Sequence, residues 1–144
     1  MGITSTCGEN HVGKAPELKI LEQICRKATE TKKLEEEELA KLLNVFGERL
    51  TRAMETVKER RVKRYIFSPR NRNVWIVVGK TRDYLIMPAA DFCTCDDFYF
   101  RVMDNQIHLC YHLIAQKLAN ALGNYDTFEE SEQLYGTLMK EWER

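Results

Sequence analysis

The chain has 144 residues, 44 % of them hydrophobic, which is enough to close one modest core without disulfides. Its 22 Lys and Arg balance its 22 Asp and Glu, so no overall field attracts nucleic acid or a membrane. The sequence lacks a long uninterrupted apolar run and an N-terminal signal with a basic and then an apolar part. We therefore expect a soluble cytoplasmic protein, or a nuclear one in a eukaryotic source, in which any electrostatic function is local.

The N-terminal part is predicted to be a leader followed by helices. Residues 1–15 are rich in Gly, Ser and Thr, and we expect this leader to be mobile. Apolar residues at three- and four-residue steps predict a short helix over 17–27, with Cys25 on its apolar face. The same spacing predicts a long helix over 39–57, preceded by an acidic run. Gly47 weakens that helix by about 1 kcal/mol relative to Ala, which indicates a slight bend or close packing there.

The middle of the chain changes from helical to strand periodicity. Segments 65–67, 74–78 and 84–87 are enriched in β-branched and aromatic residues. The intervening segments 68–73 and 79–83 contain Pro, Asn, Gly and Asp, which are typical turn residues. The pattern predicts a three-stranded antiparallel meander with one face covered by helices.

Two further helices are predicted towards the C-terminus. Apolar spacing predicts a helix over 109–122 that ends at Gly123, a typical C-cap. A capping-box pattern over 127–130 predicts that the last helix starts there. One side of this last helix carries Leu134, Tyr135, Leu138 and Trp142. That side either docks on a partner or packs on its own domain, and the second is the more frequent role of an amphipathic terminal helix.

Together these elements predict an α+β fold made of N-terminal helices, the meander, a metal site and two C-terminal helices. After the leader, residues 16–144 are expected to form a single domain. Its helical part covers 16–60, the sheet and the metal site cover 61–123, and the C-terminal helix covers 126–143.

Three of the five cysteines lie within 18 residues beside a histidine, which is a poor disulfide framework and a good metal framework. Cys93 and Cys95 at a strand end point to one face. Cys110 and His112 would point about 200° apart inside a helix, so we expect this pair to straddle a helix start. The alternatives are core cysteines with a satisfied histidine, or His108 as the fourth ligand.

A Cys₃His set of this kind suits zinc. Four protein ligands complete a tetrahedral site and leave no open position for catalysis. No further Cys is placed for an iron–sulfur cluster. We therefore expect one structural Zn²⁺ ion held by Cys93, Cys95, Cys110 and His112.

Residues 52–83 carry ten basic and three acidic side chains. Tyr65 and Trp75 are interleaved with these charges, a combination by which proteins grip single-stranded nucleic acid. The alternative is that both aromatic residues belong to the core and that the charges solvate the sheet. The candidate nucleic-acid-binding residues are Arg60, Arg61, Lys63, Arg64, Arg70, Arg72, Lys80 and Arg82.

The CxC pair at 93–95 and the CxH pair at 110–112, followed by an apolar helix, resemble the SWIM zinc finger. The chain is most similar to the small stand-alone SWIM proteins of the eukaryotic Shu complex, and its enrichment in charge favours an archaeal source. The resemblance implies a non-enzymatic protein of homologous recombination and DNA repair. Such a protein docks on a RecA-family recombinase paralogue and assists filament assembly on single-stranded DNA.

Three other functions remain to be compared with this one. A generic nucleic-acid-binding zinc finger would use the basic segment directly. An adaptor in another process is the second alternative, because SWIM fingers also occur in transposase-like and ubiquitin-linked proteins. A zinc deaminase is disfavoured because neither its HxE nor its PCxxC motif occurs, and a zinc hydrolase needs an open metal position. We expect no enzyme, no membrane contact and no small-molecule substrate.

Overall fold

The computed structural model describes residues 15–95 and 109–143. The predicted leader therefore lies almost entirely outside the described residues. The helices are α1 (Ala15–Thr31), α2 (Glu36–Phe46), α3 (Glu48–Lys58), α4 (Tyr111–Leu122) and α5 (Tyr135–Trp142). The strands are β1 (Val62–Ser68), β2 (Arg72–Val78), β3 (Asp83–Met87), β4 (Phe92–Cys93) and β5 (Asp126–Ser131). Within these ranges no helix is both long and apolar enough to cross a membrane.

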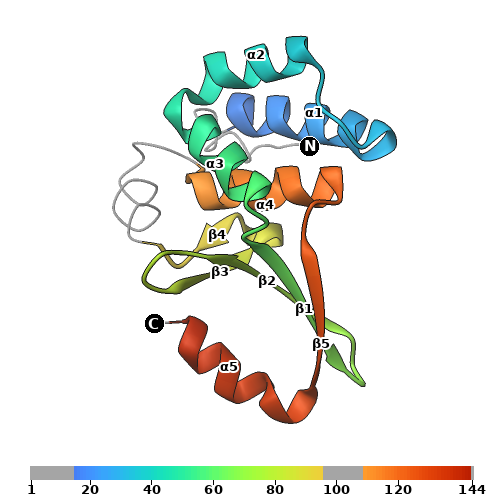
Figure 1. The fold of residues 1–144 in the computed structure, drawn as a ribbon, viewed down its shortest axis with the longest axis vertical. Helices are drawn as coiled ribbons and strands as arrows, with labels where there is room; N and C mark the ends of the chain where they lie inside the picture. The colour runs from blue at the N-terminus through green and yellow to red at the C-terminus, as the bar shows by residue number, and fades with distance from the viewer. Residues whose placement is uncertain (1–14, 96–108, 144) are drawn as a thin grey trace, which may run out of the picture.

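The strands form one five-stranded sheet in the order β4-β3-β2-β1-β5. Strands β1 to β4 pair antiparallel in sequence order, whereas β5 pairs parallel to β1. Helix α4 lies above the sheet with α1, α2 and α3 around and beyond it, and α5 lies below the sheet (Figure 1). The α+β class and the predicted meander are confirmed, with one more strand added at each edge of the meander.

The prediction of a helix over residues 126–143 is wrong in its first part. Residues 126–131 form β5, and α5 begins only at Tyr135. The residues of β5 lie opposite β1 from Lys63 to Ser68, and the Phe128 ring lies 5.2 Å from the Tyr65 ring. A capping-box pattern reports only local preference, and the ladder with β1 outweighs it here.

The predicted long helix is divided at Gly47 into α2 and α3. Gly47 has φ +61° and ψ −131°, a backbone conformation that residues with a Cβ atom rarely adopt, so the chain turns there instead of continuing as one helix. Helix α2 starts earlier than predicted, because the Glu35 and Glu38 side chains form a reciprocal capping box.

The core has two parts, one on each side of the sheet. The larger part lies between the helices and the face of β2 that carries Trp75 and Val77, and the smaller part includes Val74, Ile76 and Trp142. Trp75 is only 8 % exposed, so it is a core residue and its ring is not free to bind a nucleic-acid base. Because β2 is buried on both faces, its sequence is continuously apolar over 74–78.

Candidate metal centre

Four buried side chains meet where the sheet is joined to α4. Cys93 lies on β4, held to β3 by pairing with Ile86, and Cys95 follows two residues later. Cys110 is the extended N-cap residue of α4, and His112 lies in the first turn of that helix. The four candidate ligand atoms lie within 4.8 Å of one another. We call these four residues the metal centre; the competing ligand His108 lies outside the described residues.

The protonation of the thiols shows why this cluster suits a cation. Hydrogen bonds with Cys110 and Cys93 lower the pKa of Cys95. Hydrogen bonds with Cys110 and then Cys95 raise the pKa of Cys93, and burial raises the pKa of Cys110. The thiols share protons in the absence of a cation, and a bound divalent ion would replace those protons.

The histidine completes the donor set. His112 is 4 % exposed, and its Nδ1 atom is buried with no hydrogen-bond partner among the described residues. Three sulfur atoms and one nitrogen atom at this separation fit the tetrahedral coordination of Zn²⁺. The residues present therefore fit the group that the sequence predicts.

Side chains around the metal centre hold its two halves in place. The Arg82 guanidinium donates to the carbonyl of Thr94, between the two cysteines, at 2.6 Å. On the other side, Arg49 donates to the carbonyl of Leu109 at 2.6 Å and forms an ion pair with Glu17. The predictions assigned Arg82 to DNA and overlooked Arg49. Neither role has a sequence signal, because each arginine bonds a backbone carbonyl far from it in the chain.

The chain is similar to curated proteins that carry the same finger. It is 28 % identical over 107 residues to the Zinc finger SWIM domain-containing protein 7 homolog of Dictyostelium discoideum, covering 73 % of this chain and 69 % of that protein. It is also 28 % identical over 105 residues to the human Zinc finger SWIM domain-containing protein 7, covering 72 % and 74 %. Over most of its length the chain is therefore similar to proteins named for the SWIM zinc finger, and the fold brings its Cys₃His set together.

The chain is also similar to an archaeal protein. An uncharacterized protein of Archaeoglobus fulgidus is 38 % identical over 85 residues, which cover 59 % of this chain and 66 % of that protein. No family model matches the chain, and no solved structure matches it significantly.

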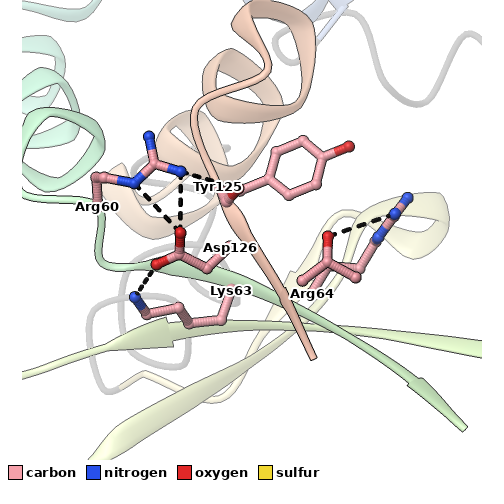
Figure 2. A network of polar contacts seen from close by, with 6 residues as sticks. Arg60, Lys63, Arg64, Tyr125 and Asp126 are labelled. Carbon is pink, nitrogen blue, oxygen red and sulfur yellow. Dashed lines mark hydrogen bonds and ion pairs between the residues drawn. The ribbon is translucent and has the colours of Figure 1, made fainter. Parts of the chain in front are cut away.

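Several basic residues predicted to bind DNA form contacts with other residues of the chain. Asp126 accepts hydrogen bonds from Arg60 at 2.9 Å and from Lys63 at 2.6 Å, as Figure 2 shows. The Arg64 guanidinium lies 5.2 Å from the Tyr125 ring and donates to the Thr127 hydroxyl (Figure 2). These contacts fasten β5 to β1.

Some of the remaining predicted DNA-binding residues contact other residues of the chain, and others are exposed. Arg72 lies 4.3 Å from the Tyr135 ring and forms an ion pair with Glu132. Arg61 donates to the Val78 carbonyl and pairs with Glu59, while Arg70 and Lys80 are exposed. Most of the predicted DNA-binding side chains therefore contact other parts of the chain, and their binding to nucleic acid stays a prediction.

The Asp126 contacts predict a pH-dependent difference between variants. Hydrogen bonds from Lys63 and Arg60 lower the pKa of Asp126, so its stabilising effect is present above the usual value near 3.9 and is lost as pH falls through the lower pKa. We expect Asp126→Asn to lower Tm at pH 7 by roughly 1–3 °C. Thermal melts of both chains between pH 7 and pH 3 should show that the difference in Tm becomes smaller as the pH falls. A difference in Tm that stays constant over this range would contradict the stabilising role of Asp126.

Proposed function

We propose that this protein is a non-enzymatic accessory protein of homologous recombination and DNA repair, built around one structural zinc ion. The observation that carries this proposal is the closed set of four buried ligands in a chain similar to proteins named for the SWIM zinc finger. A hydrolytic zinc site needs a position for water, and a Cys₃His set occupies all four positions.

The zinc ion would hold two segments of the chain together. When bound, it would link the end of β4 to the start of α4 through the Cys93–Cys95 pair and the Cys110–His112 pair. Helix α4 is the most buried helix of the described chain, and Leu113, Ile114 and Leu118 on it are fully buried between the sheet and α1. Fixing the first turn of α4 therefore fixes the orientation of the surrounding helices, which are the surface offered to a partner.

The proposed partner is a RecA-family recombinase paralogue. Its support is the resemblance to the stand-alone SWIM proteins of the Shu complex, together with the identity to proteins named Zinc finger SWIM domain-containing protein 7. We place the complex in the cytoplasm, or in the nucleus of a eukaryotic source. The internal contacts of Arg60, Lys63 and Arg64 disfavour the alternative of a generic DNA-binding finger that uses the whole basic segment.

A pull-down from the native organism tests the partner and the metal together. The tagged chain should carry about one zinc per molecule by atomic emission, and mass spectrometry should find a recombinase paralogue among its strongest hits. The His112→Ala variant used as bait should lose both the zinc ion and the recombinase, because the proposed partner surface depends on the bound zinc. Enrichment of ubiquitin-linked or transposase-like proteins without a recombinase would instead favour the adaptor alternative.

A further inference from the structure

A basic hollow of about 360 Å³ lies beside the metal centre. We call it the basic hollow. It opens between α3, the start of α4 and the turn that joins β2 to β3. Its lining residues are Arg52, Glu55, Thr56, Arg61, Gly79, Lys80, Thr81, Tyr84 and Tyr111.

The hollow carries cations that the rest of the fold does not neutralise. Three basic side chains face one carboxylate, that of Glu55. In the described parts of the chain, Arg52 and Lys80 form no ion pair with a carboxylate. Arg61 is paired with Glu59 and donates through Nε to the Val78 carbonyl, so within the described residues the unpaired cations of the hollow are Arg52 and Lys80. The hollow therefore favours an anionic ligand.

The walls of the hollow are held in a fixed arrangement. The His112 ring lies between those of Tyr84 and Tyr111, with centroid distances of 4.3 and 4.0 Å. The Arg52 guanidinium lies 5.8 Å from the Tyr111 ring. A Cβ atom on Gly79 would come within 2.6 Å of the Tyr84 ring, so the turn that carries Lys80 packs closely on that tyrosine. The two tyrosines of the hollow therefore pack on a residue of the metal centre, and Arg52 lies beside one of them.

We propose that the basic hollow binds a phosphodiester of single-stranded nucleic acid, an inference that rests on the proposed role in recombination. Arg and Lys charges beside tyrosines and threonine hydroxyls are the groups that track a single-stranded backbone. Glu55 can accept a hydrogen bond from a base N–H group, such as N3–H of thymine, whereas the carboxylate of an acidic side chain offers it no donor.

Binding of fluorescein-labelled oligo(dT) to the zinc-loaded full chain tests the proposal. Anisotropy should be measured from 50 to 300 mM salt for the natural chain and for the double variant Arg52→Ala with Lys80→Ala. We expect the variant to bind at least tenfold more weakly at 100 mM salt. The slope of log K against log salt should fall by about 1.4, since each lost phosphate contact on a single strand contributes roughly 0.7.

The matched control is Lys19→Ala with Lys41→Ala, which removes the same charge from exposed positions on α1 and α2. This control should bind within twofold of the natural chain, and both variants should keep their zinc and their Tm. Equal weakening by the control variant, or binding of poly-glutamate as tight as that of oligo(dT), would overturn the proposal. Failure of the natural chain to bind oligo(dT) would also overturn the proposal. The zinc content of that chain and its capture of a recombinase would still test the proposed function separately.

Discussion

Replacing Cys95 by Ser is expected to release the zinc ion and unfold the junction between β4 and α4. A structural zinc site contributes roughly 10–16 kcal/mol in small zinc-finger peptides, and a whole domain is stable by only about 5–15 kcal/mol. The variant would leave a buried, unpaired set of Cys93, Cys110 and His112 in the largest core. We expect Tm to fall by more than about 20 °C, or no cooperative transition at all.

The matched control for this experiment is Cys25→Ser on α1. The Cys25 thiol is partly buried and donates to the Lys117 carbonyl at 3.6 Å, and burial raises its pKa to about 11. It therefore remains a neutral thiol and is not expected to bind metal. Differential scanning calorimetry and zinc analysis should show one zinc and a small change in Tm for the control. A Cys95→Ser chain with normal zinc content and normal Tm would contradict the structural role of the metal centre.

Replacing Trp142 by Ala is expected to detach α5 from the lower face of the sheet. Trp142 is 5 % exposed, packs in the core part that contains Phe67 and Leu85, and its ring lies 4.9 Å from that of Tyr65. Truncation of a buried tryptophan costs about 3–5 kcal/mol. For a chain of this size the expected decrease in Tm is roughly 6–20 °C.

Leu134→Ala provides the matched apolar truncation, because Leu134 precedes the same helix and is 45 % exposed. Its effect on unfolding should stay within about 0.5 kcal/mol. Guanidinium melts of the two variants compare the decreases in the free energy of unfolding directly. If both decreases are equal and small, α5 does not close the core. That result would favour the other interpretation of its apolar side, docking on a partner.

The sequence by itself was enough to predict the parts of this protein that depend on neighbouring residues. The two-residue spacing in each ligand pair identified the metal centre, because that spacing restricts how a strand end and a helix start can present their side chains. The end of α4 was predicted correctly, since Gly123 adopts the left-handed C-cap conformation with φ +75°. The turn residues between β1, β2 and β3 likewise predicted the meander.

Only the tertiary structure decided the features that join distant segments. Residues 126–131 form β5 because β1 supplies a complete ladder and Lys63 supplies a partner for Asp126. The same contact pairs Lys63, one of the predicted DNA-binding residues, with a carboxylate of its own chain. Arg52 was counted among the local basic charges but was not a candidate site residue, and the fold places it in one hollow with Lys80. Local periodicity carries no information on such pairings, because they are selected by the whole fold and by the packing around the metal centre.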